Sequence, residues 1–278
     1  MKFGAHVSIA GGVFNAPLNA AEFGCEVFQM FSRSPQGGPA PKLTKEIVDE
    51  FQKNCEAAKQ EEWVIHAPYY INLASAKDAL RKNSARIVRE ELERGTILGA
   101  KYMMFHPGSA KDVGEEKGVK LVIETMKRAL DGYKGTTELL VEISAGAGAV
   151  IGDSFEEVGA ILKGVGHKDV GVCFDTAHAF ASGYDLRTKK AIDATLKAFD
   201  KHIGLSRFKM SHCNDSKVEL GARKDRHEHF GKGFIGLQAF KELVNHPKLQ
   251  HINLYCETEY DAVKEDLKIL KKARKVRS

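Results

Sequence analysis

The 278-residue sequence has no long apolar run, no closely paired cysteines and no linker that would divide it. No stretch approaches the ~18–20 uninterrupted apolar residues of a membrane span. The N-terminus lacks the basic and apolar regions of a secretory signal. The five cysteines are scattered without a CxxC pair, so we expect reduced thiols in a cytoplasmic protein rather than a disulfide framework. Walker A and GxSxG motifs are also missing.

Charge is modest overall and concentrated locally. The 42 Lys and Arg residues exceed the 37 Asp and Glu residues by five, and hydrophobic residues make up 43% of the chain. A net charge of +5 permits a polyanionic partner without requiring one. Seven of the basic residues fall in one stretch: Arg207, Lys209, Lys217, Arg223, Lys224, Arg226 and Lys232.

Short apolar runs alternate with segments of helical periodicity along the whole chain. The apolar runs, typical of buried strands, cover residues 2–8, 25–31, 62–66, 101–106, 138–143, 170–175, 207–212 and 252–257. The helical segments cover residues 44–60, 76–99, 116–132, 155–164, 188–203, 237–245 and 261–275. Apolar strands alternating with helices predict a parallel sheet covered by helices. Eight such units predict one α/β fold, a (β/α)8 TIM barrel that spans residues 1–278 as a single domain.

Six of the apolar runs end on, or one residue after, a histidine or a carboxylate: His66, His106, Glu142, Asp175, His212 and Glu257. In a (β/α)8 barrel these positions all lie at the C-terminal mouth of the strands. A single histidine at a strand end is usually a hydrogen-bonded structural residue, but burying six such groups together is costly unless they are paired or ligated. Mixed imidazole and carboxylate sets suit zinc and manganese. The strand ends therefore predict a metal site at the mouth of the barrel.

Two further segments extend this set. His178 closes the DTAH segment 175–178, and the polar loop after the seventh run contains DRH at 225–227. An extended backbone would place Asp225 and His227 on one side of that loop. Five histidines and four carboxylates are too many for one four-coordinate zinc and enough for two or three ions. Multi-metal sites suit phosphoester hydrolysis, and four carboxylates beneath three dications leave a positive charge that attracts a phosphodiester.

The segments around these side chains form recognisable motifs. They are GAHVS (4–8), FHPGS (105–109), VCFDTAHAF (172–180), GYDLR (183–187), HCNDSK (212–217) and the segment 221–233 that contains DRH. Together they resemble the signatures of endonuclease IV, and the resemblance runs from residue 2 to about residue 258. It implies a metal-dependent apurinic/apyrimidinic endonuclease of base-excision repair.

The resemblance implies three zinc ions, with manganese as an alternative at one or more positions. The implied ligands are His66, His106 and Glu142 for the first ion; Glu142, Asp175, His212 and Glu257 for the second; and His178, Asp225 and His227 for the third. The implied reaction is hydrolysis of the phosphodiester 5′ to an abasic site, leaving a 3′-hydroxyl, with removal of blocked 3′ ends at the same site. Water would be the nucleophile, so Glu142, the bridging ligand, is the residue that we expect to be catalytic.

The expected partner is double-stranded DNA with abasic or 3′-blocked sites, bound by a monomer. Lys217, Arg223 and Arg226 border the expected mouth, where contacts to phosphates would position the strand; ordinary solvated loop charges are the alternative. The family uses the position of Tyr69 to enter the base stack. Relatives often carry an Arg and a Trp in the loop at 34–39, and this sequence has SPQGGP there instead.

Two other functions remain open. The first is a sugar isomerase or epimerase on the same barrel with one divalent metal, which would leave His178, Asp225 and His227 without a role. The second is a non-enzymatic scaffold that binds nucleic acid and keeps a metal for stability.

Other titratable residues receive no place among the ligands. His6 is expected to be structural. His229 and His246 have no partner in the pattern, so we expect them at the surface. Cys213 adjoins His212 and is a candidate ligand, but alternate side chains of a strand face opposite ways, so only one of the two could serve.

Overall fold

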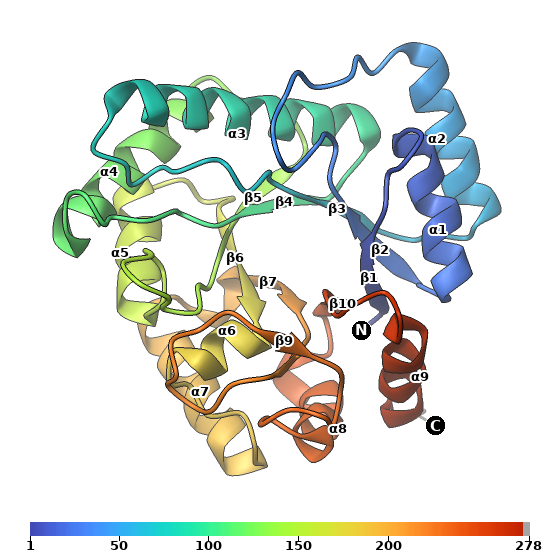
Figure 1. The fold of residues 1–278 in the computed structure, drawn as a ribbon, viewed down its shortest axis with the longest axis vertical. Coiled ribbons are helices and arrows are strands. Elements are labelled where there is room, and N and C mark those ends of the chain that lie inside the picture. The colour runs from blue at the N-terminus through green and yellow to red at the C-terminus, as the bar shows by residue number, and fades with distance from the viewer. Residues whose placement is uncertain (275–278) are drawn as a thin grey trace.

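Eight parallel strands close into a barrel in the computed structural model, which describes residues 1–274 (Figure 1). The strands are β1 (Phe3–Val7), β2 (Val27–Met30), β3 (Trp63–His66), β4 (Tyr102–Phe105), β5 (Glu138–Glu142), β6 (Gly171–Asp175), β7 (Phe208–His212) and β10 (Asn253–Cys256). Each strand pairs with the next of these along the chain, and β10 closes the barrel on β1 with Leu254 opposite Phe3. The predicted (β/α)8 barrel is confirmed.

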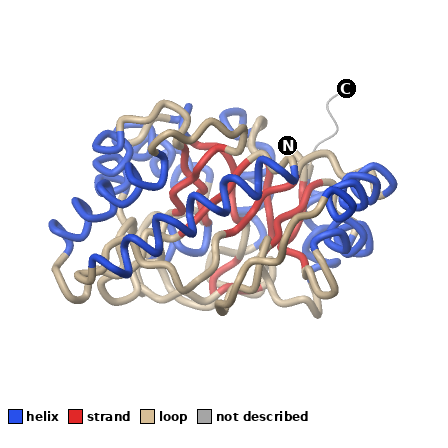
Figure 2. Tube along the Cα trace, turned by 90° about the horizontal axis from the view of Figure 1, so that it is seen from above, coloured by secondary structure: helices blue, strands red, loops and turns tan. Residues whose placement is uncertain are grey.

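Helices surround the strands on the outside, so that the strands gather in the centre of the molecule (Figure 2). The helices are α1 (Ala16–Phe23), α2 (Lys45–Ala57), α3 (Asp78–Leu98), α4 (Glu115–Leu130), α5 (Phe155–Val165), α6 (Thr176–Ala181), α7 (Lys189–His202), α8 (Leu237–Asn245) and α9 (Val263–Ala273). Seven of them match predicted segments, whereas α1 and α6 were not predicted. The predicted end of the last segment, residue 275, lies outside the described residues. Within residues 1–274, no helix has both the length and the apolar character that crossing a bilayer requires.

The inside of the barrel is filled by a cluster of apolar side chains, capped at the mouth by polar ones. The cluster consists of Val27, Val64, Tyr102, Met104, Leu140, Cys173, Met210 and Tyr255. Side chains two positions apart on a strand point the same way, so the residue two places after an inward apolar residue also points inward. On β5, for example, Leu140 is followed by Glu142, and on β7 Met210 is followed by His212. This alternation carries the predicted strand-end residues to the axis of the barrel.

A small hairpin holds the DRH segment over the mouth. It pairs β8 (Asp215–Ser216) with β9 (His227–Glu228) in an antiparallel arrangement within the connection between β7 and α8. The carboxylate of Asp215 accepts hydrogen bonds from the backbone N–H groups of Gly231, Ile235 and neighbouring residues. This buried acid therefore fixes the loop that follows β9.

Candidate metal centre

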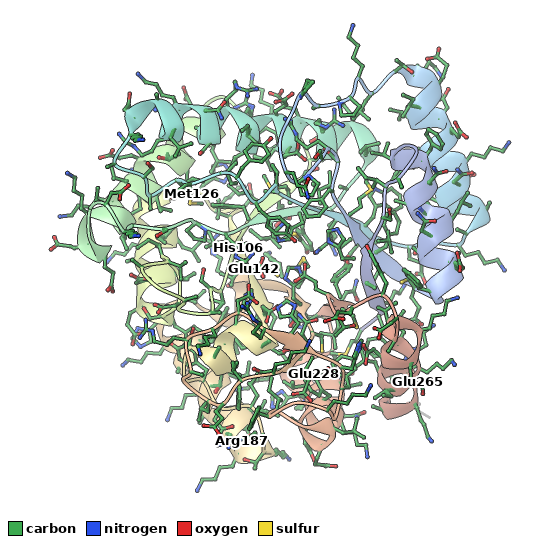
Figure 3. All side chains as sticks on the ribbon, viewed as in Figure 1. His106, Met126, Glu142, Arg187, Glu228 and Glu265 are labelled. Atoms are coloured by element: carbon green, nitrogen blue, oxygen red, sulfur yellow. The ribbon has the colours of Figure 1, made fainter. Side chains whose placement is uncertain are left out.

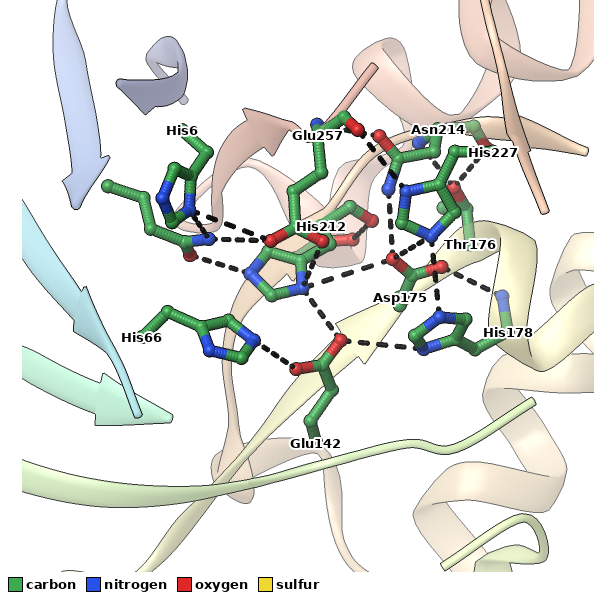
Figure 4. Close-up of polar contacts among 12 residues, drawn as sticks. His6, His66, Glu142, Asp175, Thr176, His178, His212, Asn214, His227 and Glu257 are labelled. Carbon is green, nitrogen blue, oxygen red and sulfur yellow. Dashed lines mark hydrogen bonds and ion pairs between the residues drawn. The ribbon is translucent and has the colours of Figure 1, made fainter. Parts of the chain in front are cut away.

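The carboxylate of Glu142 lies at the centre of the site and contacts four imidazoles. Its Oε2 atom lies 3.5 Å from Nε2 of His66 and 3.5 Å from Nε2 of His106. Its Oε1 atom lies 2.8 Å from Nδ1 of His212 and 3.4 Å from Nδ1 of His178. Figure 3 shows Glu142 near His106 in the middle of the molecule, and Figure 4 shows its contacts with His66, His178 and His212. Residues from β3 and β7, from the position after β4 and from α6 thus converge on one side chain.

The carboxylates of Glu257 and Asp175 both lie near Nδ1 of His212. Oε2 of Glu257 is 3.2 Å from Nδ1 of His212, and Oδ2 of Asp175 is 3.9 Å from the same nitrogen. Asp175 also accepts a hydrogen bond from the backbone N–H of His178 at 2.8 Å, so it caps the N-terminus of α6. One side chain therefore both belongs to the cluster and orients the helix that carries His178.

The third predicted group also comes together. Nε2 of His178 and Nε2 of His227 face each other at 3.3 Å. Oδ1 of Asp225 lies 3.1 Å from the first of these nitrogens and 3.4 Å from the second. Asp175 reaches the same place, with Oδ2 3.6 Å from Nε2 of His227. Asp225 and His227 thus point to one side of their loop, and Asp175 joins their group as well as that of His212.

Several groups of these side chains have the spacing of metal ligands. Within each of four groups, one ligand atom per residue lies within 4.8 Å of all the others: His66, His106 and Glu142; Glu142, Asp175, His212 and Glu257; Asp175, His178 and His227; and Glu142, Cys173 and His212. Oε2 of Glu142 is buried without a hydrogen-bond partner. An unpaired buried carboxylate oxygen is costly, and a cation between it and the two facing imidazoles would satisfy all three. The residues present fit divalent ions.

Neighbouring charges and burial shift the pKa values of several side chains in the cluster. Burial alone would raise the pKa of Glu257, but the imidazoles of His212 and His66 outweigh it and lower the pKa to about 2. The pKa of Glu142 also lies well below its usual range, because His106 and His212 outweigh the effect of burial. Burial lowers the pKa of His106. These shifts favour the ionised form of the two carboxylates and the neutral form of His106, which are the forms that bind a metal.

His178 and His212 are exceptions, because the pKa of each imidazole lies well above its usual value. Burial would lower the pKa of His178, but the neighbouring carboxylates of Asp175 and Asp225 raise it. These carboxylates favour the imidazolium form of His178, so a metal that binds there would compete with a proton.

Two amide side chains that sequence reasoning missed hold the cluster in place. Gln29 donates from Nε2 to Glu257 at 2.6 Å and to Nδ1 of His6 at 2.9 Å, and its Oε1 lies 2.6 Å from Nε2 of His212. Because an amide oxygen only accepts, Nε2 of His212 carries a hydrogen, and Nδ1 is the nitrogen that would face a bound cation. Asn214 donates to Oδ2 of Asp175 at 2.9 Å. The signal that could have revealed Gln29 is an amide within the apolar run of β2, two places after the inward-facing Val27.

Two of the predicted surface histidines are in fact buried, so that prediction was wrong. Nδ1 of His229 lies 2.7 Å from Asp266, and Nε2 of His246 lies 3.1 Å from Asp193. Each imidazole is buried because a carboxylate from a distant helix pairs with it. Cys213 belongs to none of the four groups, whereas Cys173 belongs to one of them.

The predicted DNA-contacting residues lie around the mouth. Tyr69 is 64% exposed and packs against the ring of His66. Lys217 pairs with Glu259 at 3.0 Å, and Arg223 forms an ion pair with Asp153. Arg226 donates to the backbone oxygen of its neighbour Asp225 at 2.6 Å. The outermost cluster residue, Asp225, is 53% exposed at its side chain, so the site opens to solvent on this side.

A family model and several known proteins match this chain over most of its length. The family model described as xylose isomerase-like TIM barrel matches residues 17–276. The chain is 38% identical over 275 residues to the probable endonuclease 4 of Campylobacter hominis, covering 97% of each chain. It is 39% identical over 257 residues to the probable endonuclease 4 of Aquifex aeolicus, covering 92% of this chain and 91% of that one.

Solved structures agree with the sequences. The crystal structure of endonuclease IV from Thermus thermophilus matches with a TM-score of 0.87 and 32% identity over 98% of both chains. A D-tagatose 3-epimerase-like protein matches with a TM-score of 0.74 at 18% identity, which shows a shared fold alone. With relatives of this name aligned along nearly its whole length, the chain belongs to the endonuclease IV family of xylose isomerase-like TIM barrels.

Proposed function

We propose that this protein is a metal-dependent endonuclease of DNA repair. It hydrolyses the phosphodiester 5′ to an abasic site in double-stranded DNA to leave a 3′-hydroxyl, and it removes blocked 3′ ends at the same site. The observation that carries the proposal is the Glu142 carboxylate, which contacts four imidazoles and belongs to three of the four ligand groups. Relatives named endonuclease 4 support the same activity.

The ligand groups would hold three zinc ions, with manganese possible at one or more positions. The proposed ligands are His66, His106 and Glu142; Glu142, Asp175, His212 and Glu257; and His178, Asp225 and His227. When bound, such ions act as Lewis acids toward phosphoryl oxygens and make water a stronger nucleophile. No separate side-chain base is needed, and Glu142 is the proposed catalytic residue because it links the groups.

The chain's own residues set the geometry of this centre. Gln29 fixes the tautomer of His212, and the backbone oxygen of Ile143 contacts Nδ1 of His178 at 3.0 Å. That contact turns Nε2 of His178 towards His227. Hydrogen bonds of this kind orient metal-binding imidazoles and raise their basicity.

Side chains around the mouth would hold DNA by contacting the sugar-phosphate backbone of the DNA. Lys217, Arg223 and Arg226 are the proposed phosphate contacts, and Tyr69 is the proposed aromatic contact with the opened duplex. Phosphate contacts position a strand without reading its sequence. We further propose that residues 1–278 form a single endonuclease domain that acts as a cytoplasmic monomer.

A single-metal sugar epimerase is the weaker candidate. A single-metal site would give His178, Asp225 and His227 no function, although their imidazole nitrogens and carboxylate oxygen lie within 3.4 Å of one another. The epimerase-like neighbour shares the fold only, at 18% identity.

Cleavage of a defined duplex tests the proposal. The substrate carries one tetrahydrofuran abasic analogue, and the product ends are identified by extension with a polymerase, which requires a 3′-hydroxyl. We expect incision 5′ to the analogue by the metal-loaded protein, and a loss of more than about 100-fold in Glu142→Gln, since even residues that only support metal ligands cost about 10–100-fold. Glu138→Gln, at the opposite end of the same strand, is the matched control. An intact lesion strand with the wild-type protein would refute the proposed function.

A further inference from the structure

A groove of about 610 Å³ runs beside the metal centre. Its lining includes His6, Phe31, Tyr69, His227, Glu257 and Tyr260. The volume lies within the range of about 300–1,000 Å³ typical of ligand sites. Because His227 and Glu257 belong to the ligand groups, a molecule in this groove is in reach of whatever reacts there.

One wall of the groove is the exposed ring of Tyr260, which stacks on a second aromatic ring. Tyr260 is 53% exposed, and its ring stacks on Phe23 with 5.6 Å between centroids and 20° between planes. Phe23 ends α1, and Nζ of Lys264, at the start of α9, lies 5.9 Å from the centroid of its ring. Lys264 also pairs with Glu22 at 3.3 Å. Figure 1 shows α1 and α9 side by side, so the ring of Tyr260 rests on a support held by two helices.

Two further lining side chains are aromatic. The rings of Phe31 and Tyr69 meet edge to face at 5.4 Å, and Tyr69 is 64% exposed. Of the two acids in the lining, Glu257 belongs to a ligand group and Glu259 is paired with Lys217 at 3.0 Å. Exposed aromatic rings beside candidate metal ligands suit a flat ring joined to a phosphate.

We propose that Tyr260 stacks against the base next to the abasic position, on the DNA strand whose phosphodiester lies at the metal centre. An abasic nucleotide leaves one face of that neighbouring base without a stacking partner. This inference rests on the proposed function, because only a nucleic-acid substrate brings such a base. Stacking on an aromatic ring tolerates every base and is a general mode of binding to unpaired strands. Tyr260 is then a binding residue that contributes to affinity for substrate equally before and during reaction.

Steady-state cleavage separates this role from a structural one. Removing an interaction that is the same in the ground and transition states raises KM and leaves kcat unchanged. We expect Tyr260→Ala to raise KM for the abasic duplex about 5- to 100-fold with kcat within about twofold of wild type. Tyr260→Phe should restore the wild-type KM, and Tyr260→Leu, which keeps bulk without an aromatic face, should not.

A fluorescent base reports stacking directly. Separate duplexes carry 2-aminopurine on the 5′ side of the abasic analogue, on its 3′ side, or opposite it in the complementary strand. With the wild-type protein and Tyr260→Phe, stacking should quench the fluorescence of at least one of the two flanking probes relative to Tyr260→Ala, at saturating protein, and quenching of the opposite probe alone would contradict the proposed strand. Ile97→Ala, which truncates another exposed apolar residue on α3, is the matched control and should behave as wild type.

The outcomes are distinct. Wild-type KM and unchanged 2-aminopurine signals in Tyr260→Ala, with cleavage intact, overturn the inference and leave the proposed function standing. Wild-type behaviour of Tyr260→Leu also overturns it, since bulk would then suffice. If the wild-type protein does not cut the duplex, the proposed function fails, and the 2-aminopurine signal on the bound, uncut strand still decides whether Tyr260 stacks.

Discussion

At the scale of single residues, the side chains that build the centre depend on uncharged neighbours for their orientation. Gln29 illustrates this, because its one amide contacts His6, His212 and Glu257. Imidazole and carboxylate ligands are positioned by such hydrogen bonds as much as by their own strands.

Substituting Gln29 by Leu tests this dependence. The change keeps the side-chain bulk but leaves Nε2 of His212 without its acceptor and frees the ring to turn. We expect metal affinity or cleavage to fall about 10–100-fold with the fold retained, measured by competition with a chelating dye and by circular dichroism. Gln238→Leu on the exposed face of α8 is the control. Wild-type metal affinity in Gln29→Leu would contradict the orienting role.

Sequence reasoning reached the charged residues of the centre but not their supports. His66, Glu142 and Asp175 could be predicted because a histidine or carboxylate is conspicuous at the end of an apolar run. Gln29 sits inside such a run, and an amide there gives no comparable signal. His229 was placed wrongly because Asp266, its partner, is 37 residues away and only the fold brings them together.

At the scale of elements, the loops at the mouth are fixed by buried acids. Asp215 accepts hydrogen bonds from the backbone N–H groups of Ser216, Gly231, Gly233, Ile235 and Gly236 at 2.8 to 3.3 Å. It is fully buried, so no water can replace it. The loop that follows His227 therefore depends on one carboxylate.

Asp215→Ala should be strongly destabilising. The substitution leaves several buried N–H groups without an acceptor, and each such group costs about 1–3 kcal/mol. We expect the free energy of unfolding to fall by about 3 kcal/mol or more, measured by urea denaturation. Asp215→Asn, which keeps one acceptor oxygen, should lose less. A change of under about 0.5 kcal/mol in Asp215→Ala would show that the loop is held by other contacts.

The loop between β5 and α5 should respond to pH through Glu157. Burial first, with further contributions from Glu115 and Asp153, raises the pKa of Glu157 to about 7, although the N–H of Gly152 opposes this. The folded protein therefore binds a proton more tightly than the unfolded chain, whose Glu titrates near its ordinary value of about 4.3. The stability from this group is complete below that value and is lost as pH rises to about 7.

Comparison with Glu157→Gln isolates this effect. The amide resembles the protonated acid at every pH, so the wild type should lose on the order of 2 kcal/mol relative to the variant between pH 4 and 8. Urea denaturation of both proteins across this range measures the difference. Parallel pH profiles would show that Glu157 does not titrate in this window.

The elements themselves were largely predictable. The strands and the long helices show clear periodicity, and Thr44, Ser154 and Thr188 cap α2, α5 and α7 as hydroxyl side chains commonly do. Helices α1 and α6 were missed because both are short. The first is eight residues with Pro17 near its start, and the second is six residues that are buried all round. Neither is long enough, with one apolar face, to produce a periodic signal.

At the scale of the whole molecule, the barrel brings together residues that are far apart in the chain. His66 and His227 belong to linked ligand groups although 161 positions separate them. The parallel strands all end at the same mouth, and the β8–β9 hairpin brings His227 to it. We therefore propose that these groups act as one centre that binds several ions.

Metal content and cleavage, measured on the same samples, test that claim most directly. We expect about three ions per chain in the wild-type protein by elemental analysis, about one fewer in His66→Ala and in His178→Ala, and cleavage at the abasic analogue reduced more than about 100-fold in both. His202→Ala, whose imidazole pairs with Glu156 outside the barrel, should retain the full metal content. A wild-type protein that cleaves the lesion strand with a single ion per chain would contradict the account.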